Sequence, residues 1–293
     1  MDNLRAIALM CVAMACFAIE DMVIKIVARD LPTWQIFLLM GGVGLVMFAS
    51  LCRRHGLPLI SRAFLHPLVL VRNTGEIIAA LGFVTALTLV ELSLATAILQ
   101  GTPLAVTAAA ALVLGEQVGW RRWVAVGLGM VGILIILDPF GADFRPEALL
   151  ALLGVLGLVL RDIATRRIPQ TIPTPQLTFW GVSSYVLCGV ILFPFQPGVV
   201  VPAPATWAVL VGGAVMGASG YWALTTATRL GEVSAVVPFR YTRLIFAMAL
   251  GVLVLGERPA ATTLLGAALV VGTGLYTVLR ERRLARAAAA PAC

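Results

Sequence analysis

Charged residues are scarce in this sequence, and their scarcity excludes most water-soluble folds. Only 12% of the 293 residues are Asp, Glu, Lys or Arg, whereas 60% are hydrophobic, and the mean hydropathy is +1.00. A soluble domain of this length cannot bury that much apolar surface. We therefore expect an all-α integral membrane protein with the bilayer as its solvent.

The sequence also lacks the motifs of nucleotide, metal and hydrolytic chemistry. It contains no Walker A, HExxH or GxSxG sequence, and its two histidines, His55 and His66, have no companion ligands. The five cysteines show neither disulfide nor metal spacing. The arginines behind the net charge of +7 cluster between apolar segments, a pattern of membrane topology rather than of nucleic-acid binding. We therefore predict no enzyme activity, no metal or cofactor, and no nucleic-acid partner.

Ten apolar runs are long enough to span a membrane, and charges, prolines and glycines separate them. Glu20 and Asp21 interrupt the first run, which we interpret as a retained helix rather than a cleaved signal peptide. Arginines accumulate in alternate connecting segments, so the positive-inside rule places both termini in the cytoplasm. The predicted spans are 4–28, 33–52, 67–89, 92–114, 120–137, 146–167, 174–194, 205–228, 232–255 and 260–279.

The sequence repeats itself at an offset of 141 residues. Asp21–Lys25 (DMVIK) returns as Asp162–Arg166 (DIATR), and Leu112–Glu116 (LVLGE) returns as Leu253–Glu257 with the same letters. Five spans per repeat is an odd number, so the two halves must insert with opposite orientation. Loops that are basic in the first half correspond to loops with little or no charge in the second half. By the positive-inside rule, the two equivalent loops lie on opposite sides of the membrane, as the inversion requires. The predicted units are a first repeat, 1–140, a second, inverted repeat, 141–282, and a cytoplasmic tail, 283–293.

Three of these features together resemble the drug/metabolite transporter superfamily of the EamA type. They are the doubled five-span unit, the Leu-Gly-Glu that closes the fourth and ninth spans, and the glycine-rich fifth and tenth spans. The resemblance covers nearly the whole chain and implies a ten-helix secondary transporter of the bacterial inner membrane. The overall pattern is also similar to the bacterial aromatic amino acid exporters of this superfamily. In contrast, Asp21–Lys25 and Phe239–Arg243 are similar to branches assigned to riboflavin or S-adenosylmethionine.

Charged and aromatic residues inside the spans are the candidates for a substrate site. A charge at membrane depth costs about 2.5–3.5 kcal/mol to insert and usually faces a partner or a wet cavity. The repeat loses its symmetry at such positions, since Arg72 and Glu76 stand opposite Gly213 and Gly217. The predicted substrate-binding residues are Arg72, Glu76, Gln100, Tyr221, Trp222, Phe239, Arg240, Tyr241 and Arg243. The residues predicted to form gates or ion pairs are Glu20, Asp21, Lys25, Arg161 and Asp162.

The spacing of these charges leaves two interpretations open. Arg72 and Glu76 are four residues apart, so they either bind substrate or form an intrahelical ion pair. Asp21 and Lys25 have the same spacing and return as Asp162 and Arg166, which favours a structural or gating pair. The embedded cations outnumber the embedded anions by one, counting Lys25. The carboxylate of an amino acid would supply the missing negative charge, as would water or a lipid phosphate.

Prolines and glutamates mark the ends and interruptions of two equivalent spans. Pro103 and Pro238 lie inside the fourth and ninth spans and are predicted to kink or locally unwind them. Glu116 and Glu257 close the same two spans and are predicted to be helix-terminal structure rather than binding residues.

We expect a secondary transporter that exports small amphipathic metabolites by alternating access, with aromatic amino acids favoured. Import of riboflavin or another metabolite is the closest alternative, and a channel is the alternative from another class. Proton antiport through Glu20, Asp21 or Glu76 and passive facilitation are both compatible with the sequence. The glycine-rich fifth and tenth spans are predicted to support the bundle and to offer a homodimer contact.

Overall fold

The computed structural model describes residues 2–115, 119–141, 144–169, 171–196, 198–230 and 236–289, and these residues form helices and connecting turns without any strand. The all-α prediction is therefore confirmed. The first half contains α1 (Asp2–Val27), α2 (Thr33–Arg54), η1 (Arg62–Leu65), α3 (Pro67–Leu89), α4 (Leu92–Leu99), α5 (Thr102–Leu114) and α6 (Trp120–Leu137). The second half contains η2 (Pro146–Ala148), α7 (Leu149–Arg167), α8 (Thr174–Leu192), η3 (Phe193–Phe195), α9 (Pro204–Leu230), η4 (Val237–Tyr241), α11 (Thr242–Leu253) and α12 (Ala261–Ala289).

Within the described part of the chain, nine helical segments are long and apolar enough to cross a membrane. They match nine of the ten predicted spans, and α4 with α5 together form the fourth. The predicted ninth span, 232–255, begins outside the described residues and otherwise contains η4 and the 12-residue α11. A tenth span therefore stays a prediction.

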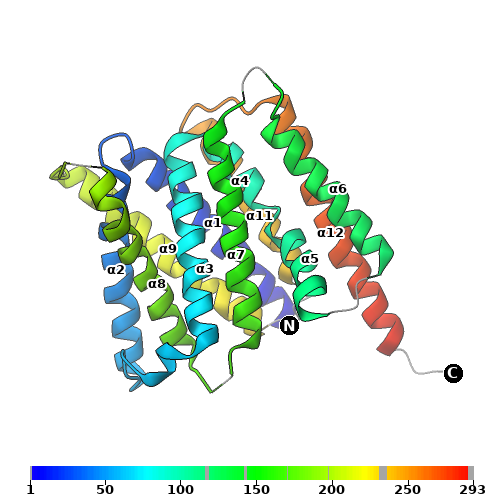
Figure 1. The fold of residues 1–293 in the computed structure, drawn as a ribbon, viewed down its shortest axis with the longest axis horizontal. Helices are drawn as coiled ribbons and strands as arrows, with labels where there is room; N and C mark the ends of the chain where they lie inside the picture. The colour runs from blue at the N-terminus through cyan, green and yellow to red at the C-terminus, as the bar shows by residue number, and fades with distance from the viewer. Residues whose placement is uncertain are drawn as a thin grey trace.

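The two halves pack through pairs of helices that the repeat relates to each other. α3 packs against α7, and α1 packs against α9. Because α7 is the repeat-mate of α1 and α9 is the repeat-mate of α3, these are two symmetry-related copies of the same contact. α2 with α8 and α6 with α12 each pair a helix with its own repeat-mate, and α4 packs against α11, which belongs to the repeat-mate of the same span. In Figure 1, α1 and α7 run in opposite directions, as do α2 and α8. Such pairing is what two oppositely inserted halves produce.

Small residues bring the most extensive of these contacts into close range. A Cβ atom added at Gly82 of α3 would lie 2.5 Å from the backbone nitrogen of Gly154 on α7. One added at Gly157 would collide with the backbone of Ala79. Only glycine fits where the backbones of two membrane helices approach this closely. The interface between halves is therefore fixed by backbone contact.

Two glutamines at equivalent positions tie the loops of one half to the helices of the other. Gln35 at the start of α2 exchanges hydrogen bonds with the backbone of Val200, where Val200 N–H donates to Gln35 Oε1 at 3.2 Å. Gln176 at the start of α8 donates to the carbonyl of Pro58 at 2.7 Å. The shared Pro-Thr-X-Gln sequence thus serves the same structural purpose in both halves, because each glutamine binds a loop of the other half.

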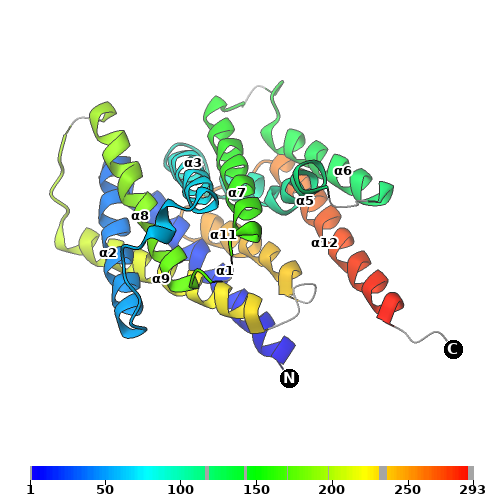
Figure 2. The same ribbon diagram turned by 60° about the horizontal axis from the view of Figure 1, so that its bottom comes forward.

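The helices α6 and α12 lie side by side at one edge of the bundle in both Figure 1 and Figure 2. Their glycines face each other, since a Cβ added at Gly266 would lie 2.5 Å from the carbonyl oxygen of Gly132. The glycines predicted to support the bundle therefore do so within one chain. The start of α1 and the end of α12 lie at the same end of the molecule, the lower end in Figure 1.

Candidate functional site

The charged side chains of the span interiors meet where α1, α3, α7, η4 and α11 come together. We call these eight residues the interior network. Its members are Glu20 and Asp21 of α1, Arg72 and Glu76 of α3, Arg161 and Asp162 of α7, Arg240 of η4, and Arg243 of α11. Both halves contribute, and so the network lies across their interface.

Asp21 forms its ion pair with Arg243, on the opposite half of the chain. The two side chains share three contacts, with Arg243 Nη2 at 2.9 and 2.7 Å from the carboxylate oxygens and Nε at 3.1 Å. The rings of Phe17 and Phe83 lie 5.2 and 5.4 Å from the guanidinium carbon of Arg243. A planar guanidinium held by a carboxylate and two aromatic faces is a strongly defined cationic site.

Lys25 does not pair with Asp21, so that predicted ion pair was wrong. Its ammonium donates instead to the carbonyl of Val90, which is the C-terminal cap of α3. A helix C-terminus presents unpaired carbonyls and partial negative charge, which attracts a flexible lysine. The repeat-mate of this pair, Asp162 with Arg166, is not settled, because the side chain of Arg166 lies outside the described residues.

Arg72 and Glu76 do not form the intrahelical ion pair that was one of the two interpretations of their spacing. Arg161 approaches Glu76 at 3.5 Å and Asp162 at 2.8 Å, so one arginine of α7 serves two acids. Long helical side chains lean toward the helix N-terminus, and this directs Arg72 away from Glu76.

Arg72 is buried and contacts neutral groups. It donates to Asn73 Oδ1 at 3.0 Å and to the Tyr221 hydroxyl at 3.3 Å, and its guanidinium rests against Gly181 of α8. Among the described residues no carboxylate forms an ion pair with Arg72. Tyr221 also lies within electrostatic range of Arg161 and so joins the two arginines.

Lys25, which is counted in the predicted excess of one embedded cation, lies in a separate cluster near the end of α1. There it lies within electrostatic range of Glu91 and Glu257. Burial, followed by the negative charge of Glu257, raises the pKa of Glu91, while Arg145 and Lys25 oppose that shift. Without Lys25 the interior network contains equal numbers of arginines and acids.

Two members of the interior network have no partner among the described residues. Neither the Glu20 carboxylate nor the Arg240 guanidinium makes a hydrogen bond or an ion pair with any of them. Arg240 lies within electrostatic range of Arg161, Asp162 and Arg243. The carboxylate of Glu20 rests against Gly217 of α9, where a Cβ atom would overlap it. The glycine that replaces Glu76 in the repeat therefore makes room for this acid.

Both predicted helix interruptions are confirmed, and they contact each other. α4 ends at Leu99 and α5 begins at Thr102 beside Pro103, while Pro238 lies in η4 ahead of α11. Gln100 donates to the carbonyl of Tyr241 at 3.1 Å. This glutamine, predicted as a substrate ligand, thus satisfies backbone groups freed by the equivalent interruption in the other half.

The predicted aromatic residues separate into different environments. Tyr221 accepts a hydrogen bond from Arg72 of the interior network, and its ring packs edge-on against Phe48. Trp222 is 54% exposed, Phe239 packs in a hydrophobic cluster of α1 and α9, and the Tyr241 hydroxyl presses against Gly274 of α12.

Three aromatic residues near the network were missed from the sequence, namely Phe17, Phe83 and Tyr185. Tyr185 lies within electrostatic range of Glu20, Asp21 and Glu76. Two signals were available. Phe17 is four residues before Asp21 on one helical face, and Tyr185 stands opposite Gly44 in the repeat.

Family comparison assigns both halves to one kind of unit. Residues 4–138 and residues 145–279 each match the EamA-like transporter family. The chain belongs to this family. The family consists of membrane transporters and not of enzymes, which agrees with the nine apolar segments of spanning length in the described part of the chain.

Curated relatives of this EamA chain transport different molecules. It is 25% identical over 226 residues to the S-adenosylmethionine uptake transporter of Rickettsia prowazekii (strain Madrid E), covering 76% of this chain and 74% of the relative. It is 30% identical over 227 residues to the riboflavin transporter of Rhizobium johnstonii, covering 73% and 71%. It is 24% identical over 274 residues to the pseudopaline exporter CntI of Pseudomonas aeruginosa (strain UCBPP-PA14), covering 92% and 95%.

A solved structure shares the fold of this EamA transporter. A crystal structure superposes with a TM-score of 0.65 over 95% of this chain and 98% of the other, at 19% sequence identity. The relatives are bacterial, and we accordingly place this multi-pass protein in the bacterial inner membrane.

The Leu-Gly-Glu of the second EamA half ends in a residue that caps a helix of the first. Glu257 accepts hydrogen bonds from Leu92 N–H at 2.6 Å, Ser93 N–H at 3.0 Å and the Ser93 hydroxyl at 2.7 Å. A carboxylate at the N-terminus of α4 satisfies unpaired amides and faces the positive end of the helix. Glu257 is thus helix-terminal structure, as predicted, whereas Glu116 lies outside the described residues.

Proposed function

We propose that this EamA protein is a secondary transporter that exports small amphipathic metabolites by alternating access, with aromatic amino acids as its first candidate substrates. One observation carries the proposal. Glu20 and Arg240 are opposite charges without a partner among the described residues, in a network whose other acids are paired. Charges at membrane depth are expensive, and those without a partner mark functional sites.

The two unpartnered groups suit the two ends of an amino acid. The guanidinium of Arg240 would hold the α-carboxylate through paired hydrogen bonds, and the carboxylate of Glu20 would receive the ammonium group. Phe17, Phe83 and Tyr185 lie close to the same network and would offer apolar and aromatic surface to the side chain. Two further predicted ligands, Arg72 and Tyr221, would bound the site on the side of α9.

Alternating access fits the way in which the halves meet. α4 with α5, and η4 with α11, are interrupted at equivalent positions, and the interruptions touch through Gln100. Substrate between Glu20 and Arg240 would lie beside these interruptions. Rocking of one half against the other would then expose the network to each side in turn.

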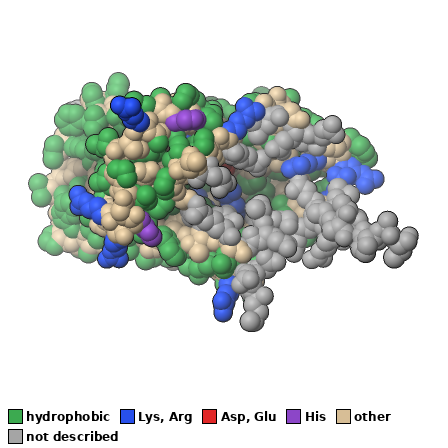
Figure 3. Space-filling model, turned by 90° about the horizontal axis from the view of Figure 1, so that it is seen from below, with side chains coloured by type: hydrophobic (Ala, Val, Ile, Leu, Met, Phe, Trp, Pro, Cys, Tyr) green, Lys and Arg blue, Asp and Glu red, His purple; other side chains and the backbone are tan. Residues whose placement is uncertain are grey.

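The orientation of the protein is proposed from its surface charge. Figure 3 views the end of the molecule that lies at the bottom of Figure 1, and Lys, Arg and His side chains are spread across it. The exposed arginines of the connecting segments include Arg53, Arg54, Arg62, Arg121 and Arg167. By the positive-inside rule we propose that this end, with both termini, faces the cytoplasm.

Counterflow in proteoliposomes tests the substrate. Purified protein should exchange labelled phenylalanine or tryptophan, and Glu20→Gln and Arg240→Gln should each reduce exchange by about tenfold or more, because each removes one charge-assisted contact. Glu147→Gln and Arg167→Gln change exposed residues of the same types and should leave exchange intact. Absence of protein-dependent exchange of either amino acid would overturn this substrate assignment.

Import is the second candidate, because two of the relatives are named as an S-adenosylmethionine uptake transporter and a riboflavin transporter. The same vesicles, loaded with either compound, measure this alternative directly. Exchange of riboflavin or S-adenosylmethionine without exchange of aromatic amino acids would favour it.

Proton coupling is proposed through Glu20, whose carboxylate lies against Gly217 and makes no hydrogen bond or ion pair with a described residue. An imposed pH gradient should drive accumulation by the native protein and leave the Glu20→Gln variant unaffected. Accumulation that ignores the gradient in both proteins would identify passive facilitation instead.

A further inference from the structure

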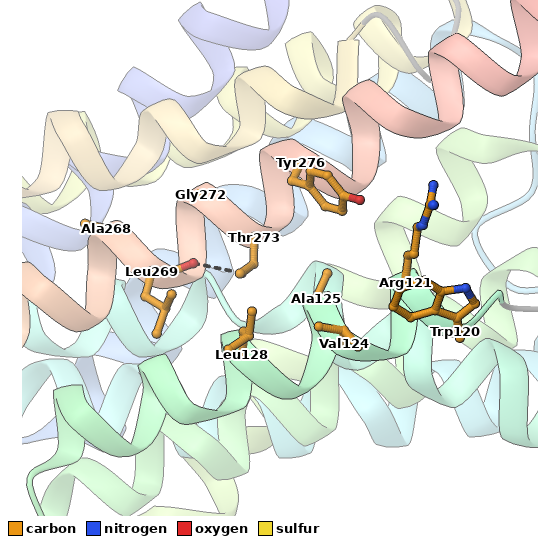
Figure 4. Close-up of a pocket in the computed structure, with 10 residues that line it drawn as sticks. All are labelled: Trp120, Arg121, Val124, Ala125, Leu128, Ala268, Leu269, Gly272, Thr273 and Tyr276. Atoms are coloured by element: carbon orange, nitrogen blue, oxygen red, sulfur yellow. Dashed lines mark hydrogen bonds between the residues drawn. The ribbon is translucent and has the colours of Figure 1, made fainter.

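The outer face of the α6–α12 pair carries a groove that the transport site does not use. Its volume is about 420 Å³, and Figure 4 shows its lining side chains on the two helices. The floor is apolar or small and includes Ala125, Leu128, Ala268 and Gly272. The polar side chains Arg121 and Tyr276 lie together toward one end in Figure 4, beside Trp120. The groove is therefore amphipathic along its length.

The length of the groove matches one leaflet of a membrane. Its lining runs along α6 from Trp120 to Leu128, which corresponds to about 12 Å at roughly 1.5 Å per residue. Half of a hydrocarbon core of roughly 30 Å is about 15 Å. An acyl chain entering beside Trp120 would therefore lie within the groove for most of its leaflet.

The polar end of the groove is suited to a negative head group. Trp120 is 70% exposed at the start of α6, as expected for an aromatic residue at the membrane surface, and the Arg121 guanidinium lies 5.3 Å from its ring centre. Gly119 is the N-cap of α6 and makes no side-chain cap hydrogen bond, so the positive end of the α6 dipole lies next to Arg121. Arg280 follows Tyr276 by one helical turn on the same face of α12.

The same chemistry disfavours a second copy of the chain as the occupant. A symmetric dimer places the same surface of each subunit against the other. The two Arg121 side chains would then lie at the same depth on facing surfaces, and among the described residues no acidic side chain lines the groove. A lipid supplies the negative charge and the apolar chain in one molecule.

We propose that the α6–α12 groove binds a phospholipid with an anionic head group. The phosphate lies against Arg121 and the start of α6, and one acyl chain fills the groove between Val124, Leu128 and Gly272. This site is separate from the interior network. Lipid binding there does not depend on which substrate the protein transports.

Binding is tested with two lipids that share acyl chains and differ in head-group charge. Detergent-purified full-length protein is titrated with phosphatidylglycerol or with phosphatidylcholine, and bound lipid is counted by native mass spectrometry. Lipids with brominated acyl chains report where the lipid binds, because bromine quenches the fluorescence of a nearby tryptophan. The contribution of Trp120 is the part of the quenching that is missing in the Trp120→Phe variant. We expect phosphatidylglycerol to bind more tightly, and Arg121→Gln to weaken it by about fivefold.

Two glycine substitutions separate the groove from the rest of the lipid-facing surface. A Cβ added at either Gly272 or Gly127 meets nothing within 4 Å, so both positions accept leucine. Gly272 lines the groove, whereas Gly127 lies on the exposed surface of α6 outside it. Gly272→Leu should abolish preferential phosphatidylglycerol binding and the quenching of Trp120, and Gly127→Leu should preserve both.

Three results would overturn the proposal. Equal binding of the two lipids would indicate ordinary annular contact. Retention of phosphatidylglycerol by Gly272→Leu would place its site elsewhere. A dimer in mass photometry that Gly272→Leu dissociates would show that a second copy occupies the groove.

Discussion

Glu257 and Glu20 are two glutamates of the same membrane protein in opposite situations. Glu257 accepts three hydrogen bonds from the start of α4, and Lys25 lies within electrostatic range. Glu20 makes no hydrogen bond or ion pair with the described residues and occupies the space left by Gly217. The first arrangement stabilises one conformation, whereas the second leaves a charge available for a ligand. A carboxylate whose hydrogen bonds are all made therefore indicates a structural position in this chain, and one without a partner indicates a functional position.

The largest stability effect is expected for Asp21→Asn, which leaves Arg243 buried without its carboxylate. Removing one partner of a buried pair costs about 3–5 kcal/mol, because the other charge remains uncompensated. Unfolding in denaturant and mild detergent measures the loss, with Glu20→Gln as the matched acid-to-amide control. A loss of similar size in Glu20→Gln would abolish the distinction between paired and unpartnered acids.

A smaller loss is expected for Glu257→Gln, since an amide can still accept some of the hydrogen bonds at the start of α4. Loss of a helix cap costs about 1–2 kcal/mol. Thermal unfolding checks this value, and Ser93→Ala should show part of the same loss. If the two changes were fully additive in the double variant, the contact between them would contribute nothing.

Gly217→Ala tests the role of the unpartnered Glu20, whose carboxylate lies against Gly217. The added methyl group collides only with the end of the Glu20 side chain, which can rotate away, so we expect less than about 1 kcal/mol of destabilisation. Apparent substrate affinity should nevertheless fall by about tenfold, because the carboxylate is displaced from its position. Counterflow and unfolding are measured on the same preparation. A stability loss with unchanged affinity would show that Gly217 serves packing alone.

The smallest effect concerns the pH dependence of Glu91. Its pKa is raised in the folded state above the ordinary value of 4.5, first by burial and then by Glu257. The folded protein therefore holds this proton more tightly, and the resulting stability is full below the ordinary pKa and lost as pH rises through the raised pKa. Glu91→Gln should flatten the stability profile over that interval, measured by thermal unfolding. An unchanged profile would exclude Glu91 as its source.

The sequence predicted the helices and their duplication because both depend on local patterns. Apolar runs of membrane length and the 141-residue offset are visible without any tertiary contact, and nine spans follow directly. Pro103 and Pro238 likewise reveal the interruptions, since proline removes a backbone donor wherever it lies. The ninth span is the exception, because its helix is short and preceded by η4.

The partners of the charged side chains were harder to predict from the sequence, because spacing along one helix does not determine which helix lies opposite. Asp21 and Lys25 have ideal intrahelical spacing, yet Asp21 binds an arginine 222 positions away. Tyr185 was detectable through its glycine mate at position 44, and comparing every position of the two halves would have found it. The direction in which Arg72 leaves its helix required the structure.

The reciprocal contacts of Gln35 and Gln176 have a consequence for how this protein is assembled. Each glutamine needs a loop that only the other half provides, and the close backbone contact of α3 with α7 likewise spans both halves. A half expressed alone would expose these surfaces, whereas two copies of one ancestral half could have supplied both contacts to each other. Cutting the chain between the halves and producing the pieces together should therefore restore a complete protein, and either piece alone should be degraded.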